Sequence, residues 1–465
     1  MSAKAKNVNM LEGSITKNLI LFAIPTVISG IANTLYGMAD TAVLGIFGGR
    51  EAMAGVGSTT TLYAMVFALF MGFASGVGIV IGRAIGQKNG KKVREAVHTS
   101  MICCILFGIV AAAIGIAFTE PLLRSTDVPE NIMFEAKTYM TIIFLGAPVS
   151  LAYTCASLIL GANGDVKRPM MITIASGALN VILNVVFVAG FNMTALGVAI
   201  ATLMSSTFSL ILGIICLMRE NGDIRLSFRD LKINKHSFWE LSRTGFPMGF
   251  QSFIFTFAGV IVQSAINGFG DAAIAGSSSG SSVGYLFYMA VSAVAGASTA
   301  FISQNYGAKK YDRVLKVVKN SVLIILALGG IEAVLIVFFG RFLVSLYTPG
   351  DTLTISYAYI RLLWFGGFCG LNGLAEIMTG ATRAIGKSIS PTVISIIGVC
   401  GVRVLWVRTA FVAMHKVFGD GLVSYGSVLV CFPISWIVTL VATAIVFFTA
   451  FNKVRKSADI ANVSA

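Results

Sequence analysis

The chain has 465 residues, of which 56% are apolar and only 12% are charged, with a formal net charge of +14. Soluble domains carry roughly 25% charged residues, so this composition excludes a large soluble protein. The apolar residues form runs along the whole chain, each long enough for a helix that crosses a bilayer. The sequence therefore predicts an all-α polytopic membrane protein.

Twelve transmembrane helices are expected, several of them longer than the about 20 residues that a perpendicular helix needs. In chain order they are predicted at 15–44, 52–81, 95–119, 132–160, 170–190, 195–218, 238–267, 274–302, 316–346, 354–381, 391–413 and 422–451. The N-terminal segment lacks the short apolar core and cleavage site of a secretory signal peptide, so no cleaved signal is expected.

The basic residues gather in alternate loops and at both ends of the chain. The groups lie within 4–17, 83–94, 167–168, 219–243, 309–319, 383–387 and 453–456. The positive-inside rule places these loops and both termini in the cytoplasm, and an even number of spans agrees with that. The charge therefore indicates topology in the cell inner (plasma) membrane, and no nucleic-acid partner is expected.

An internal repeat divides the chain into two halves. GRAIGQKNGKKVREAV (82–97) matches SQNYGAKKYDRVLKVV (303–318), and GDVKRP (164–169) matches GKSISP (386–391). Each half holds six spans and its matching loops face the same side, so we expect two six-helix lobes related by a parallel pseudo-twofold repeat. The expected parts are an N-terminal lobe (1–218), a cytoplasmic linker (219–237), a C-terminal lobe (238–452) and a cytoplasmic tail (453–465).

Asp40 is the one charged residue in SGIANTLYGMADTAVLGIFGG (29–49), within the first predicted span. An acid inside a membrane is costly, so its partners must come from other helices. Burial disfavours the charged form of a carboxylate, so Asp40 could take up a proton, or it could hold sodium together with neighbouring oxygens. A purely structural role, such as capping a neighbouring helix, is the alternative.

The fifth and sixth predicted spans supply candidate partners for Asp40. Asn180 and Asn184 lie four residues apart, on one helical face, and Thr202 can add a hydroxyl. Buried amides need hydrogen bonds, which Asp40 could provide. Simple packing of helices through these amides is the alternative.

Several motifs make the chain similar to the multidrug and toxic compound extrusion (MATE) family. They are ADTAVLGIFGGREAMAGVG, GRAIGQKNGKK, LILGANGDVKRPM followed by GALNVILN, and TGATRAIGKSISP. The resemblance implies a V-shaped pair of six-helix lobes that exports organic, often cationic, amphipathic compounds against a proton or sodium gradient. The same superfamily includes flippases for lipid-linked saccharides.

The resemblance also implies that Asp40, Asn180, Asn184 and Thr202 form a polar cluster that binds the coupling cation. Similar members often carry Asp where this chain has Asn184, so a single carboxylate and a one-cation stoichiometry are expected, with proton and sodium both open. No other metal is expected.

A second coupling site in the C-terminal half is less well matched. The sodium-linked branch of the family has acids on the seventh and tenth helices, at positions that here hold Phe255 and Asn372. Glu376, four residues after Asn372, and Glu332 are the candidate acids. Each could equally pair with a basic group such as Arg361, Arg403 or Arg408.

A substrate cleft and two hinges complete the predicted machinery. Methionine, aromatic and amide side chains offer an adaptable surface for varied ligands, although methionines in such stripes usually serve packing. Kinking at a proline in the first helix of each lobe could open or close a cavity. The candidate cleft residues are Tyr36, Tyr139, Asn163, Met248, Gln251 and Met289, and the candidate hinges are Pro25 and Pro247.

Other functional classes are disfavoured. No metalloprotease or nucleophile-elbow motif occurs, so an enzyme and an organic cofactor are not expected, and no filter-like loop of a channel is visible. The serious alternative is a flippase or exporter of a lipid-linked or endogenous polar metabolite, which should have a more cationic cavity. The expected partners are small organic substrates and the lipid bilayer, and a monomer would suffice.

Overall fold

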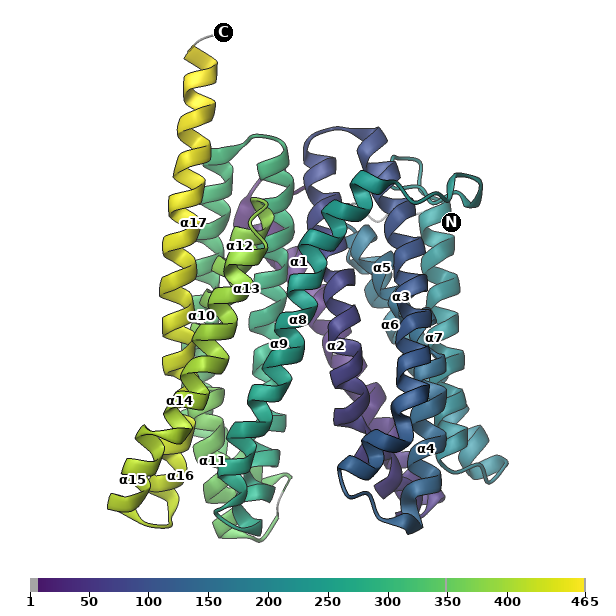
Figure 1. The fold of residues 1–465 in the computed structure, drawn as a ribbon, viewed down its shortest axis with the longest axis vertical. Helices are drawn as coiled ribbons and strands as arrows, with labels where there is room; N and C mark the ends of the chain where they lie inside the picture. The colour runs from purple at the N-terminus through teal and green to yellow at the C-terminus, as the bar shows by residue number, and fades with distance from the viewer. Residues whose placement is uncertain (1–6, 348, 464–465) are drawn as a thin grey trace. The chain divides into compact units, whose positions relative to one another are not determined.

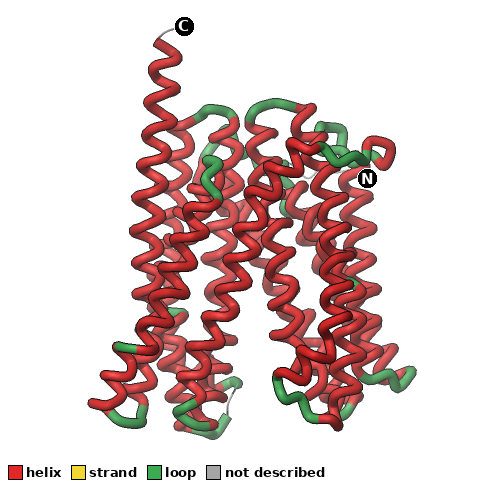
Figure 2. The backbone as a smooth tube through the Cα atoms, in the orientation of Figure 1, coloured by secondary structure: helices red, strands yellow, loops and turns green. Residues whose placement is uncertain are grey.

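The structure is a computed structural model that describes residues 7–347 and 349–463, and every regular element in these residues is a helix (Figures 1 and 2). The all-α prediction is therefore confirmed. The described chain forms two compact units, one containing Pro25–Phe253 and the described residues before Met10, the other Met10–Ile24 and the described residues from Ile254 onward. The boundaries divide helices α1 (Ile15–Val43) and α8 (Lys235–Asn267).

The first unit is built around a core of three packed helices, α2, α3 and α5. Buried apolar side chains of these helices form its largest cluster, which includes Phe73, Val97 and Ile159. After α1 the elements are η1 (Leu44–Gly48), α2 (Arg50–Gly86), α3 (Gly90–Ser125), α4 (Glu130–Leu145), α5 (Ala147–Ala162), α6 (Lys167–Asn184), η2 (Val185–Gly190), α7 (Ala195–Met218) and η3 (Phe228–Asp230). Of these, η1 and η2 are π-helical and η3 is a 3-10 turn.

The second unit has α9 at its centre, in contact with α10, α11 and α12. Helix α12 also packs along α17, the long helix that carries the C-terminus (Figure 1). After α8 the elements are α9 (Asp271–Gly307), α10 (Tyr311–Ser345), α11 (Thr352–Phe365), α12 (Cys369–Ala384), α13 (Ile389–Ser395), η4 (Ile396–Gly401, π-helical), α14 (Val402–Arg408), α15 (Ala410–Phe418), α16 (Leu422–Leu429) and α17 (Cys431–Val463).

The two halves of the sequence fold into matching elements. Helices α2 and α9 both have 37 residues and begin at equivalent positions of the repeat, and each follows a glycine with a positive φ, 86° at Gly49 and 87° at Gly270. Glycine adopts this left-handed conformation without the strain that a side chain would cause. The π-helical segments are an exception, because η4 lies eleven residues earlier in its half of the repeat than η2 does in the other half. The repeat seen in the sequence thus extends to the order and lengths of the helices.

The described residues include ten helices that are long and apolar enough to cross a membrane, and one bent pair, α4 with α5, which meet at 46°. The span predicted at 354–381 is also helical, as α11 and α12, the counterparts of that pair. It carries Arg361 and Glu376, and these charges lower its mean hydropathy. Several helices run past the predicted ends; α17, for example, continues through Val463.

Glycines allow α2 and the first half of α8 to touch through their backbones. A Cβ added to Gly72 would lie 1.9 Å from the nitrogen of Gly249, and one added to Gly76 would lie 2.8 Å from the Cα of Gly245. Small residues permit such close approach between membrane helices, where van der Waals packing drives association. Both pairs lie within the first unit.

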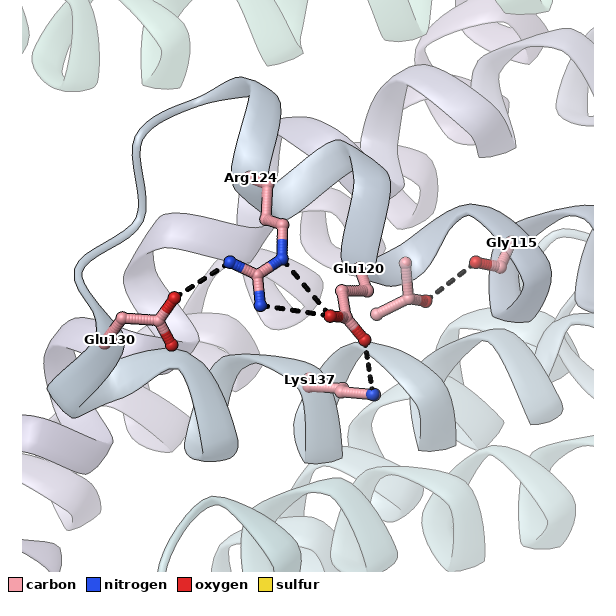
Figure 3. A network of polar contacts seen from close by, with 6 residues as sticks. Gly115, Glu120, Arg124, Glu130 and Lys137 are labelled. Atoms are coloured by element: carbon pink, nitrogen blue, oxygen red, sulfur yellow. Dashed lines mark hydrogen bonds and ion pairs between the residues drawn. The ribbon is translucent and has the colours of Figure 1, made fainter.

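An exposed network of ion pairs joins α3 to α4 across their connecting turn. Figure 3 shows Arg124 between Glu120 and Glu130, at 3.1 and 2.8 Å, and Lys137 bound to Glu120 at 2.7 Å. Because these side chains lie largely in solvent, the network contributes little to stability.

Candidate functional site

Asp40 sits in the last turn of α1, directly before the π-helical η1, and Asn184 ends α6, directly before the π-helical η2. The two π-helical segments touch one another, and their buried side chains Leu44 and Val188 belong to one apolar cluster. π-Helical turns inside membrane helices frequently mark functional sites. Here η1 follows the turn of α1 that carries Asp40, and η2 directly follows Asn184 of α6.

The structure brings Asp40, Asn180, Asn184 and Thr202 into one hydrogen-bonded cluster. Asn184 donates from Nδ2 to Asp40 Oδ1 at 2.6 Å and to Asn180 Oδ1 at 3.0 Å. Thr202 donates from Oγ1 to Asp40 Oδ2 at 3.3 Å, and Asn180 donates from Nδ2 to Thr202 Oγ1 at 3.4 Å. Helices α1, α6 and α7 each supply part of this ring.

The cluster is buried and lacks a counter-charge. Asp40 is 5% exposed, and both asparagines are fully buried. No basic side chain contacts Asp40 in the described part of the chain, because its partners are amides and a hydroxyl. Asn184 Oδ1 is also buried and has no hydrogen-bond partner. A bound cation or a proton would neutralise the carboxylate, and the arrangement offers carboxylate, amide and hydroxyl oxygens of the kind that hard cations prefer.

Asp40 lines a cavity of about 880 Å³ inside the first unit. Two of the predicted cleft residues, Tyr36 and Tyr139, line the same cavity, as does Thr202. The Tyr36 hydroxyl donates to the Thr202 carbonyl at 3.3 Å and lies 2.8 Å from Ser205 Oγ, which ties its ring to α7. The acid therefore faces a space of the size that holds small organic ligands.

The other predicted cleft residues do not line this cavity. Asn163 follows the end of α5, where its backbone nitrogen bonds the Ile159 carbonyl. Met248 and Gln251 are half-buried on α8, and Met289 is half-buried on α9.

Sequence reasoning missed Tyr63 and Phe67 of α2, which line the cavity. They lie four residues apart, and their rings meet edge to face at 6.2 Å. Aromatic residues at this helical spacing in the second predicted span were the available signal.

The repeat does not reproduce the cluster in the second unit. The residues equivalent to Asp40, Asn180 and Asn184 are Val262, Val402 and Trp406, which cannot ionise. Of the two equivalent positions, only the one in the first unit therefore carries an acid.

The candidate acids of the second unit lie in different surroundings. Glu376 accepts hydrogen bonds from Tyr288 Oη at 2.8 Å and from Asn372 Nδ2 at 3.3 Å. Glu332 is 5% exposed, and its Oε2 is buried without a partner. Neither acid forms an ion pair with Arg361, Arg403 or Arg408 in the described residues.

Comparisons with known proteins agree on one family. The family model described as MatE matches residues 25–186 and 247–407, one segment in each half of the repeat. The chain is 28% identical over 410 residues to the probable multidrug resistance protein YoeA of Bacillus subtilis (strain 168), a match covering 86% of this chain and 88% of that protein. It is 27% identical over 413 residues to the probable multidrug resistance protein NorM of Thermotoga maritima, covering 88% and 87%.

Solved structures share the fold. A structure described as "Crystal structure of MATE in the bent conformation" matches with a TM-score of 0.85 at 20% identity, covering 98% of this chain and 99% of that one. The predicted architecture of two six-helix lobes is that of these neighbours.

Proposed function

The chain belongs to the MatE family of multidrug and toxic compound extrusion transporters, and we propose that it is a cation-coupled antiporter exporting organic, often cationic, amphipathic compounds by alternating access. Asp40 binds the coupling ion, a proton or sodium, and the protein works without an organic cofactor. Its place is the plasma membrane, with both termini cytoplasmic, and the monomer is the working unit.

One observation carries this proposal: a buried carboxylate with only neutral partners lines a cavity large enough for an organic ligand. An ionised acid in such surroundings is costly, so it binds a cation readily. The cation that it prefers is set by the oxygens of Asn180, Asn184 and Thr202 together with its own. With one acid in the cluster, one monovalent cation neutralises it.

Coupling follows if the cation and the substrate bind the same cavity in different states. A cationic compound is attracted to ionised Asp40 and to the aromatic rings of Tyr36 and Tyr139. Neutralising Asp40 weakens that attraction, so cation entry favours substrate release. A ligand shifts a conformational equilibrium only by its differential affinity for the two states. The buried cluster supplies that difference because it joins three helices through the ionised acid.

Transport into proteoliposomes tests the role of Asp40. Ethidium and norfloxacin flux is measured under an imposed proton gradient and, separately, under an imposed sodium gradient, for wild type and Asp40→Asn. We expect flux driven by one of the two ions and lost in the variant. Asp127→Asn is the matched control, since Asp127 is exposed in the turn between α3 and α4, and it should leave flux unchanged.

Two outcomes would contradict the proposal in different ways. Undiminished, gradient-driven flux in Asp40→Asn would remove Asp40 from coupling. Absence of ethidium and norfloxacin flux under every gradient in folded wild type would favour the alternative, a flippase or exporter of a lipid-linked or endogenous polar metabolite.

A second coupling position is proposed at Glu376 in the second unit, with Tyr288 and Asn372 as its hydrogen-bond donors. Glu332 lacks such donors and ranks behind it. If Glu376 shares coupling, Glu376→Gln changes the number of ions moved for each substrate, which reversal potentials in proteoliposomes measure. An unchanged stoichiometry would leave Asp40 as the single coupling acid.

Hinge motion is proposed at Pro25 and Pro247, which lie inside the continuous helices α1 and α8. Each proline removes a backbone donor and permits bending. The Ser29 hydroxyl donates to the Pro25 carbonyl at 2.9 Å, one turn further along the helix. If bending at Pro25 opens the cavity, Pro25→Ala reduces flux without reducing ethidium binding; unchanged flux would remove it as a hinge.

A further inference from the structure

Two arginines of the second unit surround one aromatic ring. Arg361 on α11 and Arg403 on α14 place their guanidinium carbons 4.5 and 4.4 Å from the centroid of the Phe432 ring on α17. Arg361 also lies 5.6 Å from the centroid of Phe365. Both arginines belong to segments that lie within the predicted membrane spans.

The pair has no acidic partner. No carboxylate forms a hydrogen bond or ion pair with either arginine in the described part of the chain, although Glu332 and Glu376 lie in the same unit. Intramembrane arginines normally face a partner charge, a water-filled cavity or backbone carbonyls. Stacking on Phe432 and Phe365 offsets only part of the cost of two neighbouring cations. The pair therefore leaves a positive charge uncompensated.

The donors that remain are those suited to an oxyanion. Each Nε is already oriented by a serine, since Arg361 donates to Ser281 Oγ at 3.0 Å and Arg403 to Ser435 Oγ at 3.2 Å. Arg361 Nη1 is buried and has no hydrogen-bond partner. Arg403 is 9% exposed, and its Nη atoms form no hydrogen bond in the described residues. The serines thus hold two guanidinium planes in place, and the terminal nitrogens of both arginines have no hydrogen-bond partner among the described residues.

We propose that Arg361 and Arg403 form a binding site for an oxyanion, the carboxylate or phosphate group of an amphipathic molecule. A guanidinium binds such a group through two parallel N–H donors, and two neighbouring guanidiniums neutralise it. Phe432 and Phe365 supply an apolar surface for the adjoining part of the ligand. The group could belong to a small organic acid or to the headgroup of an anionic lipid.

This site does not depend on the proposed antiport. It lies wholly in the second unit, whereas Asp40 and its cavity lie in the first. The experiment therefore measures binding rather than transport, and loss of coupling in an Asp40 variant would not affect its result.

The test uses the purified full chain in nanodiscs of phosphatidylcholine, titrated calorimetrically with benzoate and, separately, with inorganic phosphate. We expect saturable binding of at least one probe, weakened 10-fold or more by R361Q and by R403Q. R341Q is the matched control, because Arg341 is exposed and stacks on Tyr359 at 5.2 Å, outside the pair. It removes one cation–π arginine from the same unit and should leave affinity unchanged.

Nanodiscs containing phosphatidylglycerol identify the source of the group. Benzoate affinity that falls in these discs assigns the site to an anionic headgroup, whereas unchanged affinity assigns it to a small organic acid. Should R361Q not fold, R361K replaces it; lysine keeps the charge but loses the two-donor fork, so affinity should still fall. Failure of wild type to bind either probe, or binding unchanged in both arginine variants, would overturn the proposal.

Discussion

Replacing Gly72 by alanine would probe the backbone contact between α2 and the first half of α8. The new Cβ would lie 1.9 Å from the nitrogen of Gly249, against an ordinary contact of 3.4 Å or more. The two backbones must therefore separate by about 1.5 Å, which no side-chain rotation can relieve. Overpacking of this kind costs about 3 kcal/mol, while alanine in place of glycine returns about 1 kcal/mol of helix propensity. The expected net loss is about 2 kcal/mol.

Thermal unfolding of the purified chain in detergent measures this loss. Gly57→Ala is the matched control, because Gly57 lies on the same helix and a Cβ there would meet nothing within 4 Å. We expect Gly57→Ala to unfold at the wild-type temperature or slightly above it, and Gly72→Ala several degrees below it. Equal midpoints for the two variants would refute the inferred contact between α2 and α8.

Three further predictions concern single hydrogen-bonding side chains. Asn184→Leu removes the 2.6 Å hydrogen bond to Asp40, so it should lower the free energy of unfolding by about 2 kcal/mol and abolish ion-coupled flux. Glu135→Ala removes the acceptor of the Ala195 backbone nitrogen at 3.1 Å, and should lower stability by about 1 kcal/mol through the start of α7. Asp351→Ala should lower the unfolding temperature at neutral pH, because hydrogen bonds from Thr354 hold the pKa of Asp351 below its usual range. The ionised Asp351 side chain stabilises the fold fully at pH values above its pKa in the unfolded chain. This stabilisation is lost as the pH falls through the lowered pKa of Asp351 in the folded chain.

Each of these predictions has its own control. Thr41→Val changes a residue that lines the same cavity but bonds only its own helix, at Gly37, so flux should survive; flux retained in Asn184→Leu would contradict the role of that amide. Glu135→Gln keeps an acceptor, and should recover most of the loss caused by alanine. For Asp351→Ala, a difference in unfolding temperature from wild type that stays constant from neutral to acidic pH would exclude the ionised carboxylate as the cause of that difference.

Much of the cluster around Asp40 could be predicted from the sequence. A lone acid in an apolar run demands polar partners on other helices, and Asn180 and Asn184 share a helical face that can supply them. Which oxygen receives which donor was not predictable, because that depends on how α1, α6 and α7 pack. The spacing of Tyr63 and Phe67 marked one aromatic helix face, but only the packing of α2 shows that this face lines the same cavity.

The arginine pair shows the limit of such reasoning most clearly. The sequence allows Arg361 and Arg403 to form ion pairs with Glu376 and Glu332, since opposite charges inside a membrane usually pair. In the structure they contact Phe432 and serines instead. The residues are far apart in the chain, so only the packing of α11, α14 and α17 decides which charges meet.

The sequence alone determined that the chain is a helical membrane protein with an internal repeat. A bilayer requires every backbone polar group to be hydrogen-bonded within the protein, and its thickness requires long segments, so long apolar runs form transmembrane helices. It also determined that Asp40 needs a special environment. Tertiary structure decided what that environment is, and placed the acid against a cavity. Helix periodicity is local and readable in sequence, whereas the partner of a buried charge is set by contacts between distant segments.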